Sequence, residues 1–185
     1  MQKFHTVCAC VLLLSGIALA QAVKVEPKTV SQVLDQSVTN VESEFVPTAD
    51  AMPEEKYSFV PTTGEFKGVR TFAQQVKHVA AVNYILAAAV LEEKSPADTG
   101  GENGPDAVKS KADIIKYLKD SFVYLHKATL SVNDKNLVAP IKNLFGEGTA
   151  TRLALATGAV GHCFDHYGQI VEYLRLNGII PPASR

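Results

Sequence analysis

The chain has 185 residues, of which 46% are hydrophobic, so it can bury one core of ordinary size but is too short for two full domains. Lys and Arg together number 18 against 19 Asp and Glu, which gives a formal net charge of -1. Because no basic block stands out, the sequence lacks the electrostatic footprint that binding a phosphate backbone requires, and nucleic acid is excluded as an expected partner.

The N-terminal segment has the layout of a secretory signal peptide. It begins with one lysine, continues through an apolar run from residue 7 to residue 14, and ends in small residues at the spacing of a cleavage site. The run is shorter than the ~20 residues that a membrane-spanning helix needs, and no second candidate follows it. We therefore expect residues 1–22 to be cleaved and residues 23–185 to form an exported domain, periplasmic or secreted, without a membrane span.

Four segments show apolar residues at helical spacing, and no stretch shows sustained alternation of the strand type. The expected helices cover residues 29–45, 71–91, 110–130 and 149–176. Pro47 is expected to end the first helix, and Asn177 and Gly178 followed by two prolines to end the last. Four helices with one apolar face each predict an all-α four-helix bundle. Its first two connections exceed the roughly 2 to 8 residues usual in bundles, so we expect long crossover loops or lids over one end.

Three histidines are predicted to face the core of this bundle. His162 and His166 lie four residues apart on the fourth helix, only about 40° from each other around its axis. His78 shares the inward face of the second helix with Val82 and Ile85. A lone inward histidine is more often a hydrogen-bonded core residue than a metal ligand, and the probability that such a pair arises by chance is not negligible. From spacing, both interpretations remain open.

The arrangement suits a metal ion, because rings from successive turns of one helix and one ring from a facing helix can meet at one centre. Neutral imidazole favours divalent transition metals, of which we expect Zn, Ni or Fe. Three protein ligands leave coordination positions for water or substrate, as in catalytic sites. The zinc-protease motif is absent, since the residue after His162 is Cys163, for which we expect a role in core packing.

Two polar residues flank the pair on the fourth helix. Asp165, about 60° from His162, either orients a ligand imidazole or faces solvent. Gln169, about 20° from His162, is placed to hydrogen-bond a metal-bound water or to lie at the edge of the core. His126 has no partner at ligand spacing, and we expect it to be structural or solvated. No residue is identified as a catalytic acid or base.

Three segments together indicate a family: ADAMPEEKYSFVPT after the first helix, RTFAQQVKHVAAVNYIL in the second, and HCFDHYGQIVEYLRLNGIIPP at the end. They resemble the DinB-like superfamily of metal-binding four-helix bundles, which is unrelated to the polymerase that shares the name. The resemblance covers residues 30–182. It implies a bundle wound with long crossovers and a divalent metal held by His78, His162 and His166. Many members are dimers, so a homodimer is one expectation that the resemblance carries.

The family's known activities include metal-dependent transfer reactions with small thiols, such as bacillithiol or mycothiol. A shared fold does not imply that this chain catalyses the same reaction. Export weakens the thiol-transfer interpretation, because a reduced thiol pool is scarce outside the cytoplasm. We therefore expect an exported metal-dependent hydrolase or transferase that acts on a small molecule. The alternative is a non-catalytic metal- or ligand-binding bundle of the cell envelope. A bundle that keeps the fold without metal is a further alternative.

Overall fold

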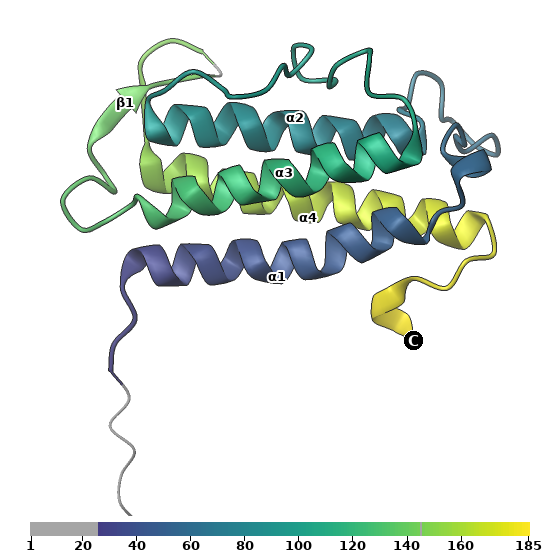
Figure 1. Cartoon of the computed structure of the whole chain (residues 1–185), viewed down its shortest axis with the longest axis horizontal. Helices are drawn as coiled ribbons and strands as arrows, with labels where there is room; N and C mark the ends of the chain where they lie inside the picture. Colours follow the sequence, from purple (N-terminus) through teal and green to yellow (C-terminus); the bar gives the residue numbers. More distant parts are fainter. Residues whose placement is uncertain (1–25, 145) are drawn as a thin grey trace, which may run out of the picture.

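The computed structural model describes residues 26–144 and 146–185. The predicted signal peptide lies outside the described residues. Four long helices dominate, as predicted: α1 (Val30–Ala51), α2 (Phe72–Leu91), α3 (Lys111–Leu130) and α4 (Arg152–Leu176). Short elements complete the chain: η1 (Glu54–Lys56), β1 (Pro140–Lys142), β2 (Thr149–Thr151) and η2 (Pro182–Ser184). The four helices lie alongside one another in a bundle (Figure 1).

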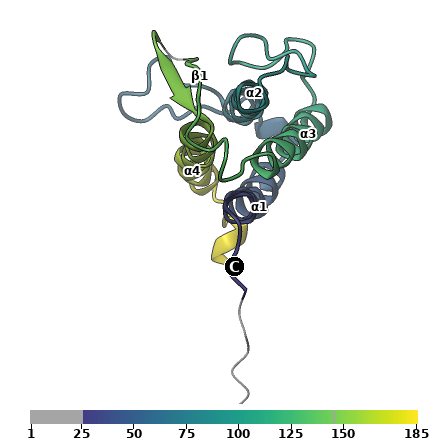
Figure 2. The same ribbon diagram turned by 90° about the vertical axis from the view of Figure 1, so that its left-hand side faces the viewer.

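The order of the helices around the bundle explains its long connections. Both α1 and α2 pack against α3 and α4, so α1 and α2 occupy opposite corners, as the end-on view in Figure 2 shows. The connection between α2 and α3 runs back along the bundle, and these two helices therefore point in the same direction (Figure 1). This connection, residues 92–110, is a true crossover of the kind predicted from its length.

Each long helix begins at a hydroxyl residue that caps it. The side chains of Thr29 and Thr71 accept the backbone N–H three residues on, and Gln32 and Gln74 return a hydrogen bond to the cap residue. These are complete capping boxes, which satisfy donors that the first helical turn leaves unpaired. Ser110 and Thr151 cap α3 and α4 through their own side chains. The second and third helices thus start within one residue of the predicted positions.

The prediction that Pro47 ends the first helix is wrong, since α1 continues to Ala51 with Pro47 inside it. A proline in a helix interior costs about 3 kcal/mol, because it removes one hydrogen bond and crowds the preceding turn. The extra turn buries Thr48, Ala49 and Met52 completely. The hydroxyl of Tyr57 also donates to the carbonyl of Ala49, at 2.8 Å, and so satisfies an acceptor in the last turn. Tertiary packing therefore outweighs the local preference.

The predicted start of the fourth helix at residue 149 is also wrong. Residues 149–151 form β2, which pairs antiparallel with β1 so that Ile141 lies opposite Ala150. β-branched threonines at both ends of β2 favour extended backbone over helix. The helix itself begins at Arg152, directly after the strand. The bundle is thus mostly helical, with one small two-stranded sheet among its described residues.

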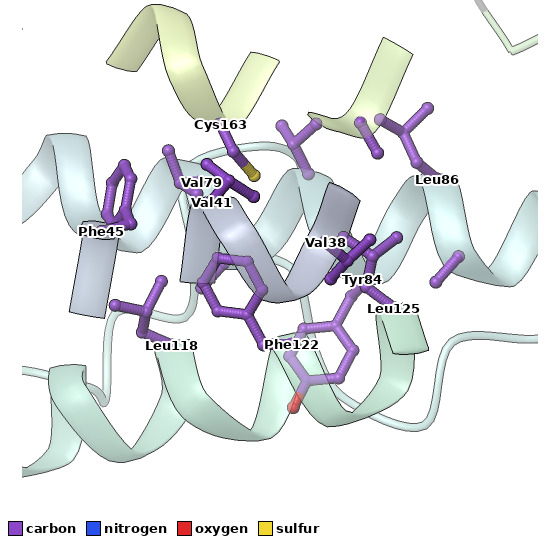
Figure 3. Close-up of a cluster of buried hydrophobic side chains, with 14 of the residues drawn as sticks. Val38, Val41, Phe45, Val79, Tyr84, Leu86, Leu118, Phe122, Leu125 and Cys163 are labelled. Carbon is purple, nitrogen blue, oxygen red and sulfur yellow. The ribbon is translucent and has the colours of Figure 1, made fainter. Parts of the chain in front are cut away.

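The core fills the space between all four helices. Phe45, Phe122 and Leu118 are among its largest completely buried side chains, and Figure 3 shows them beside Cys163. In residues 26–144 and 146–185, no helix combines the length and the apolar character that crossing a membrane requires. One core shared by four helices holds α2 and α4 side by side, and these are the helices that carry the three predicted ligands.

Candidate metal centre

The three histidines come together at the contact between α2 and α4. The ring centroids lie 4.5 Å apart for His162 and His166, 4.8 Å for His78 and His166, and 4.9 Å for His78 and His162. One ring nitrogen from each can be chosen so that all three lie within 4.8 Å of one another. His78 and His166 are buried, and His162 is partly buried. The three rings could hold one metal ion in this arrangement.

The crossover fixes the tautomer of His78. Its Nδ1 lies 2.5 Å from the main-chain oxygen of Glu102, which can only accept a hydrogen bond. Nδ1 therefore carries the ring proton in the neutral form, and Nε2 keeps its lone pair for a metal or a proton. This is the common arrangement for a ligand histidine, whose second nitrogen donates to a carbonyl or carboxylate.

A chain of three side chains fixes His166 in the same way. The Nδ1 of His166 lies 2.7 Å from Oε1 of Gln75, Nε2 of Gln75 donates to Oε1 of Gln169 at 2.8 Å, and Nε2 of Gln169 donates to Asp165 at 3.0 Å. The carboxylate can only accept, so it sets the direction of every bond before it. At the start of the chain, Nδ1 of His166 must donate, which leaves the lone pair of its Nε2 free.

The chain also shows where the two flanking polar residues lie. Asp165 is exposed and contacts Gln169 rather than an imidazole, so it reaches His166 only through two amides. Gln169 lines a neighbouring polar cavity of about 540 Å³ instead of the space beside the histidines. Gln75, which touches His166 directly, was not predicted. Gln75 lies three residues before His78, one turn away on the same face of α2. This spacing could have identified it from the sequence as a neighbour of the histidines.

The contact between His78 and His162 fits either a direct hydrogen bond or a cation shared by the two rings. Their Nε2 atoms lie 3.1 Å apart. Because Nε2 of His78 carries a lone pair, the two nitrogens repel each other unless a proton or a metal lies between them. Nδ1 of His162 is buried without a hydrogen-bond partner among the described residues. When Nδ1 of His162 carries the ring proton, three lone pairs on neutral imidazole converge, and this donor set suits a divalent transition metal.

Burial keeps all three rings neutral. Burial, together with the neighbouring rings of His166 and His78, lowers the pKa of His162 to about 3. Burial likewise lowers the pKa of His166 to about 4, and it lowers the pKa of His78 below its usual value. The charge of Arg70 acts in the same direction at all three. Neutral imidazole is the ligating form, so the rings are ready to bind a metal at neutral pH.

The histidines open into a cavity of about 670 Å³ between α2 and α4. All three rings line it, together with Arg70 and the crossover residue Glu102. The rest of the lining is mainly apolar and comes from α2, α4 and the small sheet. A volume of this size is typical of sites for small molecules. A metal held by the rings would therefore face a space that a small molecule can enter.

Two other candidates lie outside the centre. Cys163 is completely buried, its Sγ donates to Oδ1 of Asn83 at 3.2 Å, and burial raises the pKa of its thiol to about 12. It packs in the core, as expected, and has no reactive thiolate. His126 pairs with Asp35 at 2.6 Å and with Glu42 at 3.0 Å, so it links α3 to α1. Linking these two helices is a structural role for His126.

Comparison with known proteins identifies relatives that share this helical-bundle fold. A profile described as the DinB superfamily matches residues 38–170, which is more than half of the chain. A structure of a DinB-like protein from Bacillus cereus ATCC 10987 superposes with a TM-score of 0.63 at 18% identity, covering 82% of this chain and 95% of that one. A conserved protein from Enterococcus faecalis gives a TM-score of 0.63 at 14% identity, covering 81% and 98%. No curated protein matches the chain.

The two structural neighbours share the fold with this chain, and the profile spans the part of the bundle that runs from α1 through both histidine-bearing helices. The chain belongs to the DinB superfamily.

Proposed function

We propose that this protein is an exported metal-dependent hydrolase or transferase that acts on a small molecule. In this proposal His78, His162 and His166 hold one divalent transition metal, with Zn, Ni or Fe as the preferred ions. The observation that carries the proposal is the convergence of three neutral rings on one point at the wall of the 670 Å³ cavity. A closed structural site would not need such access.

A divalent ion with open coordination positions supplies Lewis acidity, which activates water or a substrate oxygen. The chain's own residues then position the reaction. Glu102 and the Gln75 chain orient two of the imidazoles, in the manner of outer-shell groups at metal sites. The apolar walls of the rest of the cavity suit the nonpolar part of a substrate. In this role Gln169 and Asp165 act through Gln75, at a distance from the substrate.

A second candidate function is non-catalytic binding of a metal or a ligand. Glu102 is the one carboxylate among the described residues that line the cavity, and its side chain is largely exposed and 3.5 Å from Arg70. A general base is more often buried beside the reacting atoms. Because no enclosed base lies among the described residues of the cavity, a binding protein is the second candidate.

Export is supported by the pattern of residues 1–22, which combines a lysine, an apolar run and a small-residue cleavage site. An exported enzyme would meet little reduced thiol, so hydrolysis or transfer without a thiol cosubstrate is the preferred reaction. Fractionation of the native host, with antibody detection of the mature chain, tests this part of the proposal. Recovery of the uncleaved chain in the cytoplasm contradicts it.

Metal analysis of the purified protein tests the centre. We expect about one equivalent of transition metal in the wild type, and a large loss in His162→Ala and in His166→Ala. His126→Ala is the matched control, because His126 lies outside the centre and pairs with Asp35 and Glu42. Equal metal content in all four proteins would remove the proposed site. Metal-dependent turnover in a hydrolase panel, lost in His162→Ala, supports the enzyme; tight ligand binding without turnover supports the second candidate.

A further inference from the structure

The cavity beside the histidines has two chemically different ends. One end holds the three imidazoles, the guanidinium of Arg70 and Glu102, whose largely exposed carboxylate lies 3.5 Å from Arg70. The other end is apolar and lies between two helices, with Val82 and Leu86 on α2 and Leu155 on α4. His78 and Leu86 are eight residues apart on α2, so the apolar wall extends ~12 Å from the polar end at 1.5 Å per residue. A ligand that fills this space must be polar at one end only.

Arg70 gives the polar end a positive charge, which is paired with Glu102 only through a long and exposed contact. Its Nη2 donates to Glu102 at 3.5 Å and to Asn103 at 3.4 Å, and both contacts are long. Among the described residues these are the hydrogen bonds of the guanidinium, so the remaining N–H groups of its planar fork are available. A metal held by three neutral rings adds two further positive charges. Such an end attracts an anion.

We propose that the cavity binds a small amphiphilic anion, whose single carboxylate head group is held by Arg70 and whose aliphatic body lies along Val82, Leu86 and Leu155. This inference rests on the proposed function in one respect only, since it names the substrate class of the same site. Arg70 and the apolar walls are present whether or not a metal is bound. The metal-free protein must therefore already select for an anionic head and an aliphatic chain.

Gly158 provides the means to test the apolar end. It lies on α4 and borders the cavity, and a Cβ at this position would have no atom within 4 Å. A leucine here projects into open space, and it also favours the helix relative to glycine. Gly158→Leu therefore adds bulk at the wall of the cavity, at a position with room for its Cβ. Gly168→Leu is the matched control, because Gly168 lies on the same helix with the same free space and does not line the cavity.

The experiment is calorimetric titration of the metal-free protein with butyrate, hexanoate, octanoate and decanoate at pH 7. We expect the Kd to fall about three- to fourfold for each added methylene until the apolar end is full. The neutral amides of the same acids should bind at least tenfold more weakly than the acids. A Kd that does not depend on chain length, or equal binding of acids and amides, overturns the proposal.

Variants separate the two ends of the ligand. Arg70→Gln should weaken every acid about tenfold or more and leave the effect of chain length unchanged, whereas Arg70→Lys should retain part of the affinity. Gly158→Leu should remove the effect of chain length, and Gly168→Leu should bind like the wild type. Wild-type binding by Arg70→Gln or by Gly158→Leu, in proteins with an unchanged unfolding midpoint, overturns the assignment of the corresponding end.

The two proposals fail separately. If the protein binds no metal but selects for aliphatic acids, the metal centre is wrong and the ligand class stands. If it binds one equivalent of metal through the three histidines but shows no preference for aliphatic acids in either form, the centre stands and the ligand class is wrong.

Discussion

The Nδ1 of His78 lies 2.5 Å from the main-chain oxygen of Glu102, so a residue of α2 is oriented by the crossover that follows it. The same crossover residue lines the cavity and approaches Arg70 through its side chain. The long connection between α2 and α3 is therefore part of the site. A change in the backbone geometry of this connection should therefore weaken metal binding, as a change in a side chain that orients a ligand does.

Gly100 is the position where this dependence can be tested. It has φ +53, and a Cβ there would lie 2.3 Å from the carbonyl oxygen of Gly104, so the two glycines close a tight turn around Glu102. Gly100→Ala should displace the turn and weaken metal binding about tenfold, measured by competition with a chromophoric chelator. Gly101→Ala is the control, because φ is +69 there but a Cβ meets no atom within 4 Å. Equal affinity in the two variants would show that the crossover does not orient His78.

Gln75 should orient His166 as the main chain of Glu102 orients His78. Gln75→Leu keeps a similar shape but removes the acceptor for Nδ1 of His166 and the donor to Gln169. We expect metal affinity to fall between about tenfold and a hundredfold, with the stoichiometry unchanged at saturation. Gln36→Leu, at an exposed position on α1, should leave the affinity as it is. Wild-type affinity in Gln75→Leu would mean that packing alone holds His166.

The sequence predicts the parts of this protein that depend on local periodicity. The helix faces, the starts of α2 and α3 near Thr71 and Ser110, and the inward position of the three histidines all follow from spacing along single helices. The partners of the histidines do not. Gln75 meets Gln169 only because α2 and α4 pack together, and Glu102 reaches His78 only through the path of the crossover.

The two local errors have the same origin. Pro47 stays inside α1 because the turn after it buries Ala49 and Met52, and residues 149–151 become a strand because Ile141 lies opposite Ala150. In both places a contact distant in sequence outweighs a local preference. Helix boundaries next to a long connection are thus hard to predict from the sequence alone.

The buried histidines should make the metal-free protein sensitive to acid. The folded-state pKa values of His162 and His166 are lowered to about 3 and about 4, whereas unfolded histidine titrates near pH 6.5. Below about pH 6.5 the unfolded chain therefore binds more protons than the folded one, and stability falls as the pH falls toward 4. Urea unfolding in the presence of a chelator should show this decrease, and His162→Gln should show a shallower one. A stability that does not change between pH 7 and pH 5 contradicts the buried, neutral state of the rings.

His126 should act with the opposite sign. Burial disfavours its charged form, but the hydrogen bonds and charges of Asp35 and Glu42 outweigh burial and raise its pKa above the usual value. The folded state therefore binds more protons than the unfolded one once the pH passes about 6.5. The contribution of His126 to stability is complete below that pH and is lost as the pH rises through the raised folded-state pKa.

His126→Gln measures this contribution. We expect the variant to lose on the order of 1 kcal/mol of unfolding free energy at pH 6, and the difference from the wild type to shrink as the pH rises to 9. Lys116→Gln is the control on the same helix, because Lys116 forms an exposed pair with Asp120 that contains no histidine, and its small effect should not change over this range. A deficit in His126→Gln that stays constant or grows with pH would mean that His126 packs as a neutral ring and that the two carboxylates do not hold its proton.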